Sequence, residues 1–194
     1  WHRFFGRRLS ETTIGIIGVG RIGLGVLRHL QGFGPIKILL NDIAPNHDLV
    51  KKFNIEWVDK EKIYQQADIV TIHVPLTSKT KNMVKSTQLL NMKKDAIIIN
   101  TARGGIINEH DLYNVLQAGH LSGAAIDVFD LEPYNGKLQD IKRCVLTAHM
   151  GSMSFDCRAR MEIEATEEAV RFLTNQPLRS IVPEEEYAVQ REGL

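Results

Sequence analysis

Three residues, Arg103, Glu132 and His149, each stand a few positions beyond a run of apolar, β-branched residues. A protonated imidazole gives its proton to an oxygen on which negative charge develops, and such general acid catalysis contributes about 10²–10⁴-fold. A neighbouring carboxylate favours the imidazolium form and fixes its orientation. A guanidinium offers a planar fork of donors that matches a carboxylate, which a lysine does not. Together these residue types predict acid/base chemistry on a small carboxylate.

Each of the three residues also has a purely structural interpretation. Arg103 is compatible with a glycine-rich surface turn, Glu132 with a solvated acid before Pro133, and His149 with a satisfied structural histidine. Most charged residues and histidines in proteins are not catalytic. The catalytic hypothesis therefore depends on the joint placement of the three residues rather than on any one of them.

The segment Gly18–Gly23 has the spacing Gly-X-Gly-X-X-Gly and lies between an apolar run and an amphipathic one. In this motif the first glycine permits a tight turn, the second lets the backbone approach a pyrophosphate, and the third allows close helix–strand packing. The N-terminus of the following helix then offers N–H groups and a partial positive charge to phosphates. In this context Gly18, Gly20 and Gly23 predict a dinucleotide-binding loop, although the same spacing also arises in purely structural turns.

Asp42 ends the next apolar run, at the position where an acidic residue meets the ribose hydroxyls of adenosine. The alternative interpretation is that Asp42 only starts the turn before Pro45, where aspartate is common. No lysine or arginine follows Asp42 until Lys51, so nothing nearby in the sequence would neutralise a 2′-phosphate. The sequence therefore favours NAD over NADP as the cofactor.

Short apolar runs alternate with longer amphipathic ones along the chain, which is typical of βαβ units and a parallel sheet. The expected strands are Thr13–Gly18, Ile36–Asn41, Ile69–His73, Ala96–Asn100, Ala124–Val128 and Cys144–Thr147. The expected helices are Ile22–Gly32, Asn46–Phe53, Lys60–Gln66, Lys85–Asn91, Glu109–Ala118 and Phe155–Leu173. We therefore expect an α/β fold of the Rossmann type, a doubly wound parallel sheet of six strands with helices on both faces.

The expected sheet places the candidate residues together, because ligands bind beyond the carboxyl ends of parallel strands. An arginine, a glutamate and a histidine that converge beside a nicotinamide form a coherent set for reduction of a 2-oxo acid. The last expected helix, which Ser154 can cap, spreads its apolar residues over more than one face. Such a helix needs more than one apolar neighbour, and a partner subunit is one candidate.

The composition is that of an ordinary soluble globular domain, with 194 residues, 43% of them hydrophobic, 24% charged, and a formal net charge of +1. Lysine and arginine do not gather into a stripe, so neither nucleic acid nor a membrane surface is indicated as a partner. Cys144 and Cys157 have no metal-ligand or disulfide spacing; no metal site is expected, and the cysteines fit a reducing compartment, most simply the cytoplasm. No apolar run approaches the roughly 20 residues that span a bilayer, and no secretory leader is expected.

The chain resembles the NAD-binding domain of the D-isomer-specific 2-hydroxyacid dehydrogenase family, which includes D-3-phosphoglycerate, D-lactate and glyoxylate/hydroxypyruvate enzymes. The resemblance extends from Trp1 to about Pro183, and its most specific stretches are IGIIGVGRIG, ADIVTIHVPLT, NTARGGIINEHDLYNVLQAGHLSGAAIDVFDLEP and LTAHMGS. It implies hydride transfer between NAD(H) and a 2-oxo or D-2-hydroxy acid substrate. It also implies a homodimer formed through the NAD-binding domain.

The resemblance assigns roles to individual residues. Arg103 would hold the substrate's carboxylate and carbonyl, Glu132 would pair with His149 as the acid/base, and Asp127 would hydrogen-bond the nicotinamide carboxamide. His73 is interpreted as a strand-end histidine without a direct role. The implied cofactor-binding residues are Gly18, Gly20, Arg21, Ile22, Gly23, Asp42, Val74, Pro75, Thr101, Ala102, Arg103, Asp127, His149, Gly151 and Ser152.

The family also supplies expected domain boundaries. Residues 1–12 would lead from an N-terminal substrate lobe missing from this chain, residues 13–176 would form the NAD-binding domain, and residues 177–194 would return toward that lobe. Without the lobe the interdomain cleft cannot close and exclude water. The chain alone is therefore expected to bind NAD(H) with little or no turnover.

Two alternatives are compatible with parts of this pattern. An NAD(H)-sensing dimeric regulator, like the C-terminal-binding-protein corepressors, keeps the same arginine, glutamate and histidine, and turnover by the full-length protein would discriminate. Other Rossmann dehydrogenases, such as alanine dehydrogenase or S-adenosylhomocysteine hydrolase, lack the combined TARGG, DVFxxEP and HxGS pattern. Formate dehydrogenases of the same superfamily carry glutamine in place of Glu132, which disfavours formate as the substrate.

Overall fold

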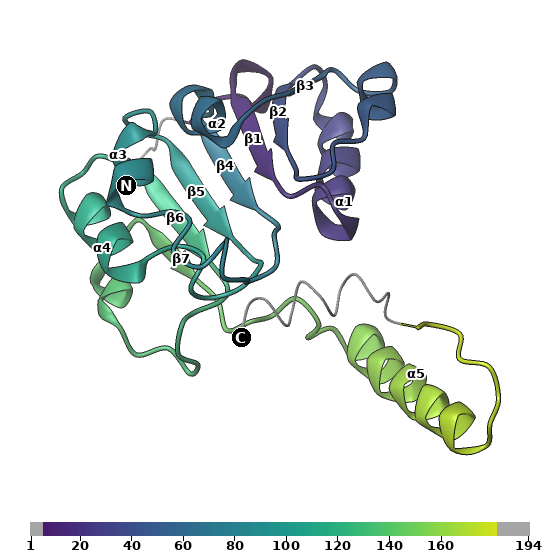
Figure 1. Ribbon diagram of the computed structural model, residues 1–194. Helices are drawn as coiled ribbons and strands as arrows, with labels where there is room; N and C mark the ends of the chain where they lie inside the picture. The colour runs from purple at the N-terminus through teal and green to yellow at the C-terminus, as the bar shows by residue number, and fades with distance from the viewer. Residues whose placement is uncertain (1–5, 182–194) are drawn as a thin grey trace.

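The computed structural model describes residues 6–181 and contains one sheet of seven parallel strands in the order β3-β2-β1-β4-β5-β6-β7 (Figure 1). The strands are β1 (Thr13–Ile17), β2 (Lys37–Asn41), β3 (Ile55–Trp57), β4 (Ile69–Ile72), β5 (Ile97–Asn100), β6 (Gly123–Ile126) and β7 (Cys144–Leu146). The α-helices are α1 (Arg21–Leu30), α2 (Lys60–Gln66), α3 (Ser86–Asn91), α4 (Glu109–Gln117) and α5 (Phe155–Leu173). From β1 the chain adds strands first on one side and then on the other, which confirms the predicted doubly wound α/β fold.

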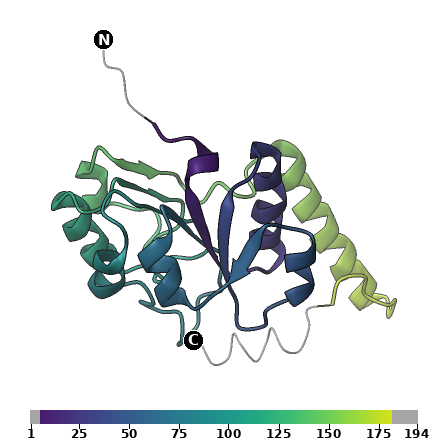
Figure 2. The same cartoon turned by 90° about the horizontal axis from the view of Figure 1, so that it is seen from above.

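Helices lie on both faces of the sheet because the side chains of each strand alternate between two apolar clusters. Ile14 and Ile16 of β1 belong to the cluster that contains Leu27 of α1. Ile17 belongs to the opposite cluster, which contains Ile63 of α2 and the buried side chains of α3 and α4. Figure 2 shows α1 separated by the strands from the helices of the opposite face.

The face that α1 covers is only partly covered at β5, β6 and β7. The strand register places Ile16 of β1 in one row with Thr71, Ile99, Ala125 and Val145. Exposure rises along that row, from a fully buried Ile16 through a half-buried Ile99 to Val145, whose relative exposure is 64%. The apolar surface of this face therefore continues beyond the part that α1 covers.

The predicted number of strands and one predicted helix were wrong. The sheet has seven strands rather than six, because the short segment Ile55–Trp57 pairs with β2 as an edge strand. The predicted helix Asn46–Phe53 is instead a single 3₁₀ stretch, His47–Lys51, begun by the Asn46 side chain accepting from Asp48 N–H. The chain must return to pair with β2 by Ile55, and that leaves room for only one short turn. The other predicted boundaries differ by up to two residues, including the end of α1 at Leu30 rather than Gly32.

Helix α5 extends away from the sheet (Figure 1), and none of its residues is buried. Its predicted cap is present, since Ser154 Oγ accepts from Cys157 N–H at 3.4 Å. Its apolar residues are exposed at both ends, 99% for Phe155 and 69% for Phe172. Within residues 6–181, no helix combines the length and apolarity required to cross a membrane.

Candidate active site and dinucleotide-binding site

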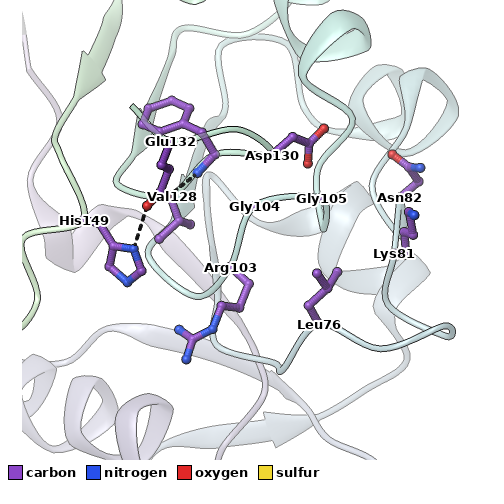
Figure 3. A pocket seen from close by; sticks show the side chains of 11 residues that line it. Leu76, Lys81, Asn82, Arg103, Gly104, Gly105, Val128, Asp130, Glu132 and His149 are labelled. Carbon is purple, nitrogen blue, oxygen red and sulfur yellow. Dashed lines mark hydrogen bonds and ion pairs between the residues drawn. The ribbon is translucent and has the colours of Figure 1, made fainter. Parts of the chain in front are cut away.

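Arg103, Glu132 and His149 line one open cavity of about 600 Å³ beyond the carboxyl ends of β5, β6 and β7. The nearest contact among them joins His149 Nδ1 to Glu132 Oε2 at 3.0 Å. Figure 3 shows Arg103 between this pair and the opposite side of the cavity, where Lys81 and Asn82 lie. The structure thus brings together the three residues that the sequence singled out for acid/base chemistry.

The Glu132 carboxylate is held in place from two sides. Its Oε1 accepts from Phe129 N–H at 3.0 Å, and its Oε2 contacts the imidazole of His149. The Phe129 N–H, and after it His149, lower the pKa of Glu132 below its ordinary value. An ionised carboxylate at this position stabilises an imidazolium. Among the described residues none accepts from or donates to His149 Nε2, so this nitrogen is available for proton transfer to a ligand.

Asp127 fixes the backbone that carries His149. His149 N–H donates to the Asp127 carbonyl at 2.8 Å, and Met150 N–H and the Thr147 hydroxyl donate to the Asp127 carboxylate. His149 has a φ of 54°, a conformation that costs a non-glycine residue about 1–3 kcal/mol and persists only where the surrounding structure imposes it. Asp127, a residue only 9% exposed, supplies these contacts through its carboxylate and its carbonyl. Any bond to a nicotinamide carboxamide would share this carboxylate, which has about four acceptor sites.

Asn100 positions Arg103, and sequence analysis did not identify this role. The Asn100 side chain is 2% exposed; its Nδ2 donates to the Arg103 carbonyl at 2.9 Å and its Oδ1 accepts from Ala102 N–H at 3.0 Å. The turn is therefore held by a buried amide, while the Arg103 guanidinium stays exposed. The available signal was a single polar residue closing the apolar run Ala96–Asn100, since a buried polar group needs partners.

Gly104 joins the arginine loop to the glutamate loop. A Cβ built on Gly104 would lie 1.9 Å from the Phe129 carbonyl oxygen, so only glycine allows the two backbones to approach this closely. Phe129 also donates its N–H to Glu132. One backbone contact therefore sets the position of Arg103 relative to the Glu132–His149 pair.

The glycine loop has the geometry that its motif predicts. Gly18 has a φ of 92°, and a Cβ on Gly23 would lie 2.0 Å from the Gly18 carbonyl oxygen. A Cβ on Gly20 would meet nothing within 4 Å, which leaves space for a ligand next to the backbone. Helix α1 has no acidic residue in its first turn and no side-chain cap, so its N-terminus is suited to an anion.

A second cavity of about 280 Å³ lies next to this loop and is lined by Gly18, Gly20, Asp42, Val74 and Pro75 of the predicted set. Asp42 Oδ2 accepts from Val19 N–H at 2.6 Å, and Asp42 Oδ1 accepts from Ala44 N–H at 2.9 Å. The carboxylate is thereby fixed at the cavity and keeps acceptor sites for ribose hydroxyls. An apolar wall, a fixed carboxylate and an open helix N-terminus fit the adenosine and pyrophosphate of a dinucleotide.

His73 also lines this second cavity. Burial lowers the pKa of its imidazole, whose Nε2 lies 2.9 Å from the Thr71 hydroxyl. The remaining predicted cofactor residues lie on the loops and the helix turn around the two cavities without lining either: Arg21, Ile22, Gly23, Thr101, Ala102, Asp127, Gly151 and Ser152.

Residues 1–151 match the family model described as "D-isomer specific 2-hydroxyacid dehydrogenase, NAD binding domain". The chain belongs to this family. A glyoxylate reductase of Korarchaeum cryptofilum is 36% identical over 198 residues, which cover 100% of this chain and 59% of that protein. A D-3-phosphoglycerate dehydrogenase of Bacillus subtilis is 34% identical over 185 residues, covering 94% of the chain and 35% of that protein.

A solved structure shows the same arrangement of the chain. The NAD-complexed D-isomer specific 2-hydroxyacid dehydrogenase of Lactobacillus delbrueckii ssp. bulgaricus superposes with a TM-score of 0.81 at 28% identity, covering 92% of this chain and 58% of that one. The chain thus spans 59% of the first of these relatives and carries the NAD-binding domain of the family. NAD is the cofactor of this domain, in agreement with the fit of the glycine loop and Asp42.

Proposed function

We propose that the protein to which this chain belongs is an NAD-dependent D-2-hydroxyacid dehydrogenase that interconverts 2-oxo acids and D-2-hydroxy acids. The observation that carries the proposal is the His149–Glu132 pair, which shares a cavity with the Arg103 guanidinium at the carboxyl edge of the sheet. When bound, NAD supplies or accepts the hydride.

The side chains of this chain would perform the remaining steps. Arg103 would bind the substrate carboxylate through its planar fork and orient the carbonyl toward His149. His149 would give its Nε2 proton to the carbonyl oxygen during reduction and take it back during oxidation. Glu132, fixed by Phe129 N–H, would hold the imidazolium at Nδ1. Asp127 and Asn100 would position His149 and Arg103 through the backbone.

The test uses the longest natural form of the protein that contains this chain. NADH oxidation is followed by absorbance with glyoxylate, pyruvate and hydroxypyruvate as separate substrates. Replacing His149 by glutamine is expected to lower kcat/KM by about 10²–10⁴-fold, the contribution of a general acid. NADH affinity should change by less than about threefold, since the glycine loop and Asp42 are untouched. His110→Gln, an exposed histidine on α4 outside both cavities, is the matched control.

Two outcomes would contradict the proposal. Full activity in His149→Gln would show that another group supplies the proton. Tight NADH binding without turnover of any 2-oxo acid would refute the proposed dehydrogenase activity and favour an NAD(H)-sensing regulator. The 194-residue chain alone should bind NADH with little or no turnover, because it spans only part of its relatives' length.

A homodimer and a cytoplasmic location complete the proposal. The family resemblance supports the dimer, and the exposed apolar residues of α5 agree with it. The two free cysteines, Cys144 and Cys157, agree with a reducing compartment. Light scattering of the purified chain tests the dimer, and a monomer at micromolar concentration would contradict it.

A further inference from the structure

Lys60 lies far from Asp42 in the sequence, but both residues line the same cavity. Lys60, the first residue of α2, lines the adenosine cavity together with Asp42 and Ile43. It is brought there by β3, because Val58 N–H donates to the Leu40 carbonyl and the Asn41 side chain donates to the Val58 carbonyl at 2.8 Å. The segments that follow β2 and β3 therefore lie side by side at the carboxyl edge.

Lys60 Nζ forms no ion pair with a carboxylate among the described residues. Its Nζ contacts the Met83 sulfur at 3.7 Å, and a thioether is a weak acceptor. Other lysines of the same domain are paired, for example Lys62 with Glu56 at 2.6 Å. Lys60 is half-buried against the cavity wall. An ammonium in this position attracts an anionic group of whatever occupies the cavity.

Asp42 carries the opposite charge in the same cavity. Its carboxylate is fixed by the N–H groups of Val19 and Ala44, at the place where an acid meets the ribose hydroxyls. This carboxylate accepts from a 2′-hydroxyl and repels a 2′-phosphate. Lys60 has the opposite preference, because its ammonium attracts a 2′-phosphate strongly and a 2′-hydroxyl only weakly.

We propose that Lys60 is a recognition residue for a phosphate on the adenosine ribose, so that discrimination against NADP(H) in this site rests on Asp42 alone. The proposal rests on the dinucleotide-binding role of the cavity. The sequence favours NAD because no cation follows Asp42 closely. The fold nevertheless brings Lys60 of α2 into the Asp42 cavity, which Lys79 of the loop after β4 also lines. The site therefore binds NADH more tightly than NADPH and needs the loss of a single charge to reverse that order.

Calorimetric titration of the 194-residue chain with NADH and NADPH tests this proposal. Asp42→Asn is expected to raise NADPH affinity at least about tenfold, because it removes a negative charge that repels the 2′-phosphate in a partly exposed site. Lys60→Met is expected to lower NADPH affinity about tenfold, in the wild type and in Asp42→Asn, and to leave NADH affinity within about twofold. Lys52→Met, which removes an exposed lysine outside the cavity, is the matched control and should change neither affinity.

Binding of two adenosine bisphosphates of equal charge shows which ribose phosphate Lys60 recognises. Lys60→Met should weaken binding of 2′,5′-ADP more than binding of 3′,5′-ADP. Equal weakening of both, equal weakening of NADH and NADPH, or unchanged NADPH affinity in Lys60→Met would overturn the role of Lys60. Absence of NADH binding by the wild-type chain would refute the cofactor site itself. If Asp42→Asn does not fold, Asp42→Ser takes its place, and the comparison of Lys60→Met with the wild type is unaffected.

Discussion

Replacing Asn100 by alanine removes the buried amide that holds the arginine turn. The substitution deletes two hydrogen bonds, one to the Arg103 carbonyl at 2.9 Å and one from Ala102 N–H at 3.0 Å. Each such bond contributes about 0.5–1.5 kcal/mol net, and a buried partner left without a bond costs about 1–3 kcal/mol. Ala102 is half-buried and Arg103 is exposed, so water can partly replace the lost amide.

We therefore expect Asn100→Ala to lower the free energy of unfolding by about 2 kcal/mol, or about 30-fold in the unfolding equilibrium. For a domain of this length, that loss corresponds to a fall in Tm of about 4–8 °C. Urea unfolding followed by circular dichroism measures the free energy. The amide proton shift of Ala102 in an NMR spectrum reports the lost acceptor directly.

The control is Asn54→Ala, because Asn54 is exposed and precedes the edge strand β3. It should change the free energy of unfolding by less than about 0.5 kcal/mol, as surface substitutions usually do. If Asn100→Ala is equally mild and the Ala102 amide shift is unchanged, the turn is held by something other than this side chain. The positioning role of Asn100 would then be rejected.

Two further predictions concern other parts of the scaffold. Burial alone would raise the pKa of Asp68, but Thr13 N–H and Lys93 lower this pKa below its ordinary value. The ionised carboxylate therefore stabilises the fold above about pH 4, and this stabilisation is lost as the pH falls through the folded-state pKa. Asp68→Asn should make the free energy of unfolding, measured with urea, less dependent on pH in the acid range, and an unchanged slope would contradict this assignment. Gly104→Ala places a Cβ against the Phe129 carbonyl and should destabilise the chain by more than about 2 kcal/mol or prevent its folding, whereas wild-type thermal stability would refute the close approach of the two loops.

Most of the fold could be predicted from the sequence because its elements carry strong local signals. Apolar runs such as Ile97–Asn100 are buried on the covered face and framed by amphipathic helices, which is the pattern of a parallel sheet. Strand β3 has no such signal. Its three residues are held by backbone pairing with β2, and the alternation Ile-Glu-Trp is too short to distinguish from a loop. The His47–Lys51 turn was missed for the same reason, since its length is set by the return to β3.

The candidate site divides in a similar way. The shared location of Arg103, Glu132 and His149 could be predicted because each follows a strand that the sequence reveals. The supporting contacts of Asn100 and the cavity position of Lys60 depend on side-chain direction and on the pairing of β3, which spacing along the chain does not encode. The Asp127 carboxylate shows the same limit, because its bonds to Thr147 and Met150 follow from the path of the loop after β7.

Helix α5 has no buried residue, and this gives the chain two levels of stability. The sheet and its packed helices open only when the whole core unfolds, whereas α5 lacks the tertiary packing that supplies most of a helix's stability in water. Amide hydrogens of α5 should then exchange with solvent through local unfolding, at rates that Ile16 and Leu27 in the core do not share. Any molecule that binds the folded α5 would raise the free energy of its local opening by the free energy of binding, and hydrogen exchange there would become slower. The hydrogen-exchange rate of α5 therefore measures whether the chain is associated with a partner.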